Sequence, residues 1–212
     1  QEVNATFRGA YMTQPEGNNE ITAQQVFNSF GFTTEMGRDD NGTIIDRPSS
    51  EYPSDEQVAA GGEGDMILSE LFTQADPSLP VRMIQLSALH GPGPATTKLV
   101  EASGSGTVAG MSYSHGGLYH QTLLPRASDT SPTIAGDAAN SINQVFRISI
   151  ANETTSGKSG KTLLGIRVFK AIDRDGKVIP NEYILLQDYI GSGCGAGSAN
   201  CDWNHNTSYI IN

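Results

Sequence analysis

The feature that most constrains this fold is a strict alternation of apolar and polar residues in the C-terminal third of the chain. Within 145–150, Phe146, Ile148 and Ile150 alternate with polar neighbours, and 164–172 repeats the pattern. Successive side chains of a strand point to opposite faces of a sheet, so a period of two predicts half-buried strands. Clusters of turn-forming residues separate the segments, as is typical of an antiparallel sandwich.

Further segments predict the rest of the architecture. Strands are expected at 81–89, 183–188 and 209–211, and one helix at 22–30, where Thr22 and Gln25 have the spacing of a capping box. Residues 37–65 are polar and turn-rich, which predicts a long loop. No internal repeat or linker divides the chain. We therefore expect one all-β domain over 1–212, a jelly-roll-like antiparallel β-sandwich with one short helix and long loops, most regular over 143–212.

Charge and hydropathy exclude two kinds of partner. The formal net charge is −10, and charged residues make up 17% of the 212 residues. Binding to nucleic acid needs clustered Lys and Arg against the phosphates, so this acidic chain is not expected to bind nucleic acid. No apolar run reaches the 18 residues of a membrane span, so no membrane insertion is expected.

Two observations predict a secreted protein at the cell surface. The only cysteines, Cys194 and Cys201, lie in a Gly-rich segment; a disulfide there would close a short loop, stabilise the fold by about 2–3 kcal/mol and imply an oxidising compartment. Free thiols or half of a metal site are the alternatives. Four Asn-x-Ser/Thr sequons allow N-glycosylation. Their asparagines are Asn4, Asn41, Asn152 and Asn206.

The sequence gives little support for catalysis. Residues 156–162 end in Gly-Lys-Thr, but Thr155 replaces the first glycine of a phosphate loop and a strand pattern follows where a helix is needed. There is no Gly-x-Ser-x-Gly nucleophile motif, and nothing selects an opposed carboxylate pair for a glycosidase. We expect a protein that is not an enzyme.

The strongest chemical signal is a set of oxygen donors suited to Ca²⁺. Asp173 and Asp175 stand on either side of Arg174 before Gly176, which is how many Ca²⁺ loops begin. The same tetrapeptide is also simply a good turn. Further carboxylate and amide oxygens follow along the chain, so the predicted ligand set is larger than the turn. It comprises Asp173, Asp175, Asn181, Asp188, Asp202 and Asn204.

A resemblance points in the same direction. The segments 168–173, 178–181, 187–189 and Asp202-Trp203-Asn204-x-Asn206 resemble a C-terminal module of large secreted bacterial surface proteins, which closes with Asp-aromatic-Asn-Asp-Asn before its last strand. The resemblance covers about 160–212 and implies a secreted β-sandwich with a Ca²⁺ site. This chain departs from the pattern at His205, where the family has Asp, and the departure weakens the expected cation site.

The remaining aromatic and imidazole side chains receive no ligand role. His90, His115 and His120 are expected to be single exposed histidines in Gly-rich loops, without metal. Trp203, the only tryptophan, either covers the cysteine loop or stacks on a sugar. The predicted function is a non-catalytic extracellular structural or adhesive module, a self-assembling surface or filament subunit that binds copies of itself or other surface proteins. The alternative is a carbohydrate-binding module that recognises glycans.

Overall fold

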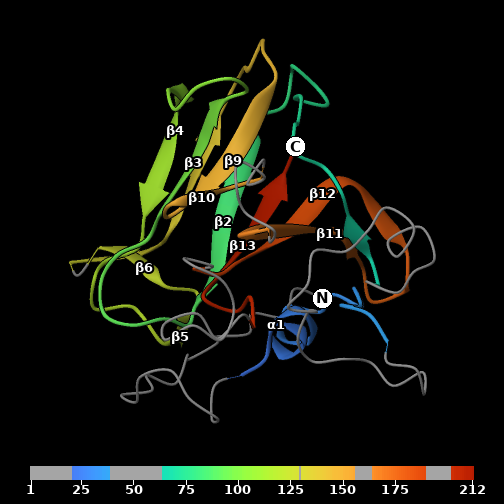
Figure 1. The fold of residues 1–212 in the computed structure, drawn as a ribbon, viewed down its shortest axis with the longest axis vertical. Coiled ribbons are helices and arrows are strands. Elements are labelled where there is room, and N and C mark those ends of the chain that lie inside the picture. Colours follow the sequence, from blue (N-terminus) through green and yellow to red (C-terminus); the bar gives the residue numbers. More distant parts are fainter. Residues whose placement is uncertain (1–20, 39–63, 129, 156–163, 190–201) are drawn as a thin grey trace, which may run out of the picture.

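The structure is a computed structural model, which describes residues 21–38, 64–128, 130–155, 164–189 and 202–212. Within these ranges it has one helix and thirteen strands (Figure 1). Their bounds are α1 Ala23–Ser29, β1 Met66–Ile67, β2 Val81–Ala88, β3 Thr96–Glu101, β4 Thr107–Ser114, β5 Thr122–Leu123, β6 Arg126–Ser128, β7 Ser131–Ile134, β8 Gly136–Ala139, β9 Phe146–Ile150, β10 Glu153–Thr154, β11 Ile166–Ile172, β12 Val178–Gln187 and β13 Asn206–Ile211.

The strands form two main antiparallel sheets. The larger has the order β1-β11-β12-β13-β2-β5, with β8 also pairing with β2. The smaller has the order β10-β9-β3-β4, and β6 pairs with β7 in a separate hairpin. The prediction of an all-β, antiparallel, sandwich-like fold with one short helix is confirmed. Among the described residues, no helix has the length and apolar character needed to cross a membrane.

The main core lies between the two sheets. Alternate residues of β11, β12 and β13 face inward, and they meet the inward residues of β3, β4 and β9. Phe146, at the start of β9, is fully buried and stacks with Phe72 at a ring distance of 6.1 Å. Members of this core include Phe72, Met83, Leu99, Met111, Tyr113, Phe146, Ile148, Ile150, Ile166, Val168, Leu185 and Ile210.

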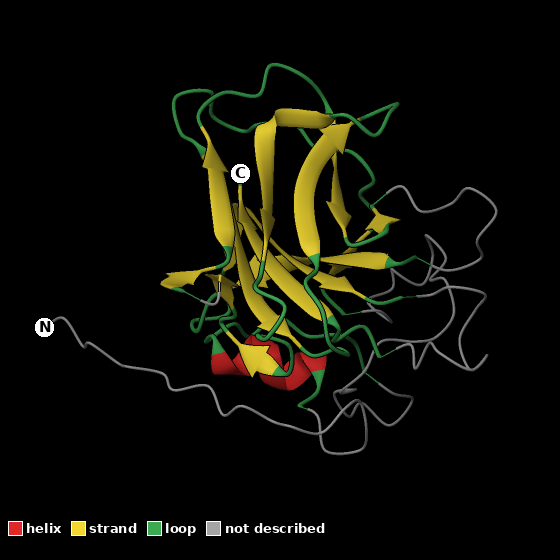
Figure 2. Ribbon diagram, turned by 90° about the vertical axis from the view of Figure 1, so that its left-hand side faces the viewer, coloured by secondary structure: helices red, strands yellow, loops and turns green. Residues whose placement is uncertain are grey.

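Helix α1 covers part of the opposite face of the larger sheet, at the lower end of the molecule in Figure 2. Thr22 caps it, and Thr22 and Gln25 form the predicted capping box. The ring of Phe27 packs edge-on against Phe169 of β11, 5.6 Å away. Phe169 alternates with the inward-facing Val168, so the strand is apolar on both faces because both are covered.

Two strands are longer than the sequence pattern predicted. β13 begins at Asn206 rather than at 209, and its polar residues Asn206, Thr207 and Ser208 are all buried. β12 begins at Val178, before a position, Asn181, whose φ is 62°. Apolar alternation cannot reveal either extension, because hydrogen bonding rather than apolar burial places these residues in the sheet.

Candidate functional site

The candidate site lies at the end of the larger sheet where β2 and β12 finish and β13 begins (Figure 1). The strand register sets it up, since Gln187 pairs with Asn206 and Asn206 pairs with Ala88. The residues just beyond these pairs therefore lie side by side. The backbone N–H of Leu89 donates to the carbonyl of His205 over 2.8 Å.

Asp188 and His205 form a buried carboxylate–imidazole pair at this end. Oδ1 of Asp188 lies 2.8 Å from Nδ1 of His205, and Oδ2 accepts a hydrogen bond from the backbone N–H of Trp203 over 3.2 Å. Both side chains are buried. The backbone N of Tyr189 is also 3.3 Å from Nδ1. One nitrogen cannot donate to Asp188 and accept from Tyr189, and the shorter contact with a carboxylate favours the tautomer that carries hydrogen on Nδ1.

Asp202 and Asn204 lie in the tight turn that precedes β13. Trp203 between them has a φ of 50°, and Oδ1 of Asp202 accepts from the backbone N–H of Asn204 over 3.5 Å. The side-chain amide of Asn204 donates to the carbonyl of Ile21 over 3.3 Å. Its oxygen Oδ1 is buried, and no hydrogen-bond donor reaches it within the described residues. This turn therefore links the last strand to the segment that leads into α1.

Trp203 is fully buried rather than available to a ligand. Its indole N–H donates to the carbonyl of Leu164 over 2.8 Å, and the guanidinium of Arg167 lies over its ring at 3.8 Å. The idea that it stacks on a sugar is therefore wrong for this fold. Its ring instead packs in the core beneath α1.

The predicted Ca²⁺ ligands fall into two separate groups. Asp173 follows the end of β11 that pairs with Val178, whereas Asp188 follows Gln187, which pairs with the other end of β11. A seven-residue strand spans about 20 Å, so these two carboxylates cannot share one ion. Asp175 and Asn181 are exposed near the first of these ends. Of the six, only Asp188, Asp202 and Asn204 lie at one place, around the backbone of Trp203, which leaves a three-residue set for the Ca²⁺ prediction.

The Asp173 carboxylate holds its own turn. Oδ1 accepts hydrogen bonds from the backbone N–H groups of Asp175 and Lys177, both over 2.9 Å. Gly176 in the same turn has a φ of 76°, which favours glycine. Within the parts of the chain that the structure describes, no group of three or more His, Cys, Asp or Glu side chains is placed to hold a metal ion.

The prediction of exposed histidines is wrong, since His90 and His115 are buried and His120 is half-buried. His90 follows β2 and His115 follows β4, and both are buried. Their Nε2 atoms face each other 3.0 Å apart, and the rings are 5.1 Å apart. Nδ1 of His90 lies 2.7 Å from the carbonyl of Gly91, and Nδ1 of His115 lies 2.9 Å from that of Gly116. The backbone N–H of Ala95 also donates to Nε2 of His115 over 3.1 Å.

Burial decides how these imidazoles titrate. Burial is the main reason why the pKa of His90 falls to about 4. The hydrogen bond to Gly91 acts in the opposite direction, and the nearby His115, His205 and His120 also act to lower the pKa. Burial also lowers the pKa of His115. The four histidines, dispersed over 116 residues of sequence, thus meet in one electrostatic neighbourhood. The signal that sequence reasoning missed is the repeated pair His90-Gly91 and His115-Gly116, which follows β2 in the first case and β4 in the second.

A row of buried amides lies beside the histidines. The Gln85 side chain donates to Oδ1 of Asn206 over 2.7 Å, and the Asn206 amide donates to Oε1 of Gln187 over 2.6 Å. Asn206 is fully buried, so a glycan on this residue does not fit the fold. Asn152 is exposed in the turn between β9 and β10, where a glycan has room. The other two sequons, at Asn4 and Asn41, and both cysteines, Cys194 and Cys201, lie outside the described residues.

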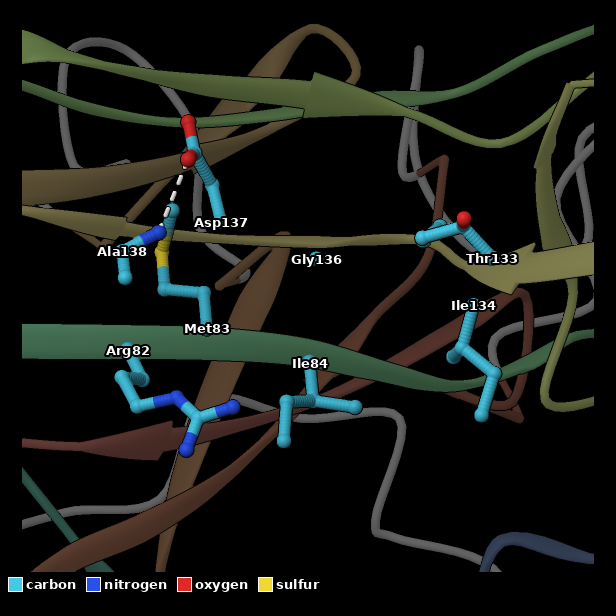
Figure 3. Close-up of a pocket in the computed structure, with 9 residues that line it drawn as sticks. Arg82, Met83, Ile84, Thr133, Ile134, Gly136, Asp137 and Ala138 are labelled. Carbon is cyan, nitrogen blue, oxygen red and sulfur yellow. Dashed lines mark hydrogen bonds between the residues drawn. The ribbon is translucent and has the colours of Figure 1, made fainter. Parts of the chain in front are cut away.

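A surface pocket with a volume of about 410 Å³ lies where β8 pairs with β2 (Figure 3). Its side chains include Arg82, Ile84 and Ile134, and the carboxylate of Asp137 points toward β4. That carboxylate accepts hydrogen bonds from the backbone N–H groups of Ser112 and Ala138, over 3.0 and 2.8 Å. The Asp137 carboxylate therefore connects β8 to β4, a strand of the smaller sheet.

Comparison with known proteins gives no relative. No protein-family model matches the chain, and neither a curated protein nor a solved structure matches it. The resemblance of residues 160–212 to secreted bacterial surface modules stays a prediction.

Proposed function

We propose that this chain is an extracellular, non-catalytic structural or adhesive module that binds copies of itself or other surface proteins. The observation that supports it most is the use of its acidic side chains inside the fold. Asp188 accepts from the backbone N–H of Trp203 and contacts the His205 ring. Asp137 accepts from a backbone N–H of β4, and Asp173 accepts from backbone N–H groups of its own turn. Each of these carboxylates either connects segments that are distant in sequence or stabilises a turn. Acidic side chains used in this way stabilise the fold, which supports a structural role.

One end of the sandwich offers a contact surface for such a partner. Phe72 and Phe146 form an isolated antiparallel bridge and point into the core. The residues just before them, Leu71 and Val145, therefore point outward, and they are 48% and 41% exposed. The side chain of Gln74 connects the segments at this end, because it donates to the carbonyl of Leu79 and accepts from the backbone N–H of Ile142. Leu79 is 60% exposed.

We call Leu71, Leu79 and Val145 the apolar rim. Apolar side chains grouped on a surface favour protein contact over water. Sedimentation of the full chain over a range of concentrations tests this role. We expect concentration-dependent association that Val145→Asp abolishes. Val178→Asp is the matched control, because Val178 is an exposed valine at the start of β12, outside the rim, and its replacement should leave association intact.

A chain that stays monomeric at all concentrations, and forms no assemblies in electron micrographs, would count against self-association. Equal loss of association in the Val145→Asp and Val178→Asp proteins would count against the rim as the contact. Binding to a glycan array in place of self-association would favour the carbohydrate-binding alternative.

The Ca²⁺ part of the proposal rests on Asp188, Asp202 and Asn204. A cation that binds only the folded chain at a hundredfold excess over its Kd raises the free energy of unfolding by about 2.7 kcal/mol. Thermal unfolding with Ca²⁺ and with a chelator should show this difference in the native chain. Asp202→Ala should abolish it and Asp175→Ala should not, since Asp175 lies in the separate turn. Identical unfolding with and without Ca²⁺ would contradict a Ca²⁺ site.

A further inference from the structure

The protons of the His90–His115 pair pose a problem that the protein groups alone do not solve. A carbonyl oxygen only accepts hydrogen bonds, so the contacts with Gly91 and Gly116 place hydrogen on Nδ1 of both rings. A neutral imidazole carries only one hydrogen on its two ring nitrogens. Neither Nε2 atom then carries a hydrogen, and the two face each other at 3.0 Å. Nε2 of His115 accepts from the backbone N–H of Ala95, so neither ring can donate to the other.

Two ring nitrogens that carry no hydrogen repel each other at this distance unless a positive charge lies between them. A proton on one ring would serve, but both rings are buried, and burial opposes a charged imidazole. A metal ion solves the same problem at neutral pH, because neutral imidazole nitrogens are its ligands. Metal-binding histidines also donate their second ring N–H to a carbonyl or carboxylate, as both members of this pair do.

We propose that His90 and His115 bind a divalent transition-metal ion of the Zn²⁺, Ni²⁺ or Cu²⁺ class through their Nε2 atoms, with His205 as the third ligand. Two nitrogens at about 2.0–2.1 Å from a tetrahedral ion lie about 3.3–3.4 Å apart, so the observed 3.0 Å must open by only a few tenths of an ångström. Imidazole nitrogens favour these ions over Ca²⁺, which takes oxygen ligands.

Two observations make His205 the candidate for the third ligand: its contact with Asp188 and its location at the same end of the sheet. Its Nδ1 lies 2.8 Å from Oδ1 of Asp188. A carboxylate in this position orients a metal-binding imidazole and raises its basicity. Its backbone carbonyl accepts from the backbone N–H of Leu89, the residue before His90, so His205 and His90 lie at the same end of the larger sheet. Among the residues that the structure describes, no three such side chains converge, so the His205 ring must move toward the pair when the ion binds.

Metal binding also replaces one hydrogen bond. Ala95 donates its backbone N–H to Nε2 of His115, the atom that would hold the ion. The amide of Ala95 therefore loses this acceptor in the metal-bound chain. Its exchange with solvent deuterium gives a local readout at the site, separate from any change in overall stability.

The experiment uses the full chain, freed of metal with a chelator and kept non-reducing. Calorimetric titration with Zn²⁺ at pH 7.5 should show one ion per chain, and Co²⁺ should give visible absorption bands of a nitrogen-ligated ion. His90→Gln and His115→Gln should each weaken binding about tenfold or more, as should His205→Gln. Tyr113→Phe is the control, since Tyr113 is a buried neighbour on β4 whose hydroxyl contacts Ser208, and its replacement should leave affinity unchanged.

Two results would overturn the site. One is a native chain that takes up no Zn²⁺, Ni²⁺ or Co²⁺; the other is binding that survives both His90→Gln and His115→Gln. If these variants do not fold, nitrogen-15 NMR of the native chain decides, because Zn²⁺ must shift the Nε2 resonances of both rings. Binding unchanged in His205→Gln would overturn the third ligand alone.

Discussion

The space between the two sheets and the end of the larger sheet are built by different forces. The core between the sheets is built mainly from apolar side chains such as Phe146 and Ile210. The sheet end buries amides, imidazoles and carboxylates such as Gln187, His90 and Asp188. Apolar packing is non-directional and tolerates exchange of similar volumes. A buried polar group is stable only with its partner in place. The sheet end is therefore the more specific region, and the core carries more of the stability.

The largest expected effect is in the core. Phe146→Ala removes a fully buried ring that stacks on Phe72, and it should lower the free energy of unfolding by about 3–5 kcal/mol. Urea denaturation measures this loss. Phe146→Leu keeps most of the volume and should cost clearly less. A cost below that of Asp188→Ala would reverse the assignment of stability to the core.

At the sheet end, Asp188→Ala should cost about 3 kcal/mol. It leaves the Trp203 N–H and the His205 ring buried without their acceptor. Asp188→Asn retains an acceptor oxygen and should cost less, measured by the same urea denaturation. Equal stability of the alanine variant and the native chain would show that the pair does not hold the turn before β13.

Acid should weaken the metal-free chain through its buried histidines. The folded pKa of His90, about 4, lies below its ordinary value of 6.5, so the unfolded chain binds protons first as pH falls. The stabilisation is complete above pH 6.5 and is lost between pH 6.5 and 4, by up to about 3 kcal/mol from this residue. Denaturation in a chelator at several pH values measures the slope. His90→Gln should flatten it, and an unchanged slope would contradict this source.

The smallest effect belongs to the turn before β12. Asp173→Ala removes the acceptor of two backbone N–H groups and should cost about 1 kcal/mol. Asp175→Ala, in the same turn but exposed, should stay within about 0.5 kcal/mol of the native chain. Thermal unfolding of the two variants side by side makes the test. A larger loss in Asp175→Ala would mean that this turn has a role beyond its own geometry.

Sequence reasoning succeeded where the signal was local. The capping box at Thr22 and Gln25, and the alternation around Phe146 and Ile148, depend on neighbours a few residues apart, and the structure confirms both elements. It failed for β13, whose first residues are polar. Asn206 belongs in that strand because Gln85 and Gln187 bind its amide, and these partners lie 121 and 19 residues away in the sequence.

The sequence by itself determined that this is an all-β chain with one short helix. Apolar residues recur every two positions in a strand and every three to four in a helix, so the sequence shows both elements directly. Only the tertiary structure decided which polar side chains meet. The register of β2, β12 and β13 placed Asp188 with His205 and separated it from Asp173, and the ends of β2 and β4 brought His90 to His115. Such contacts depend on strand pairing across the whole chain, which no local pattern of residues encodes.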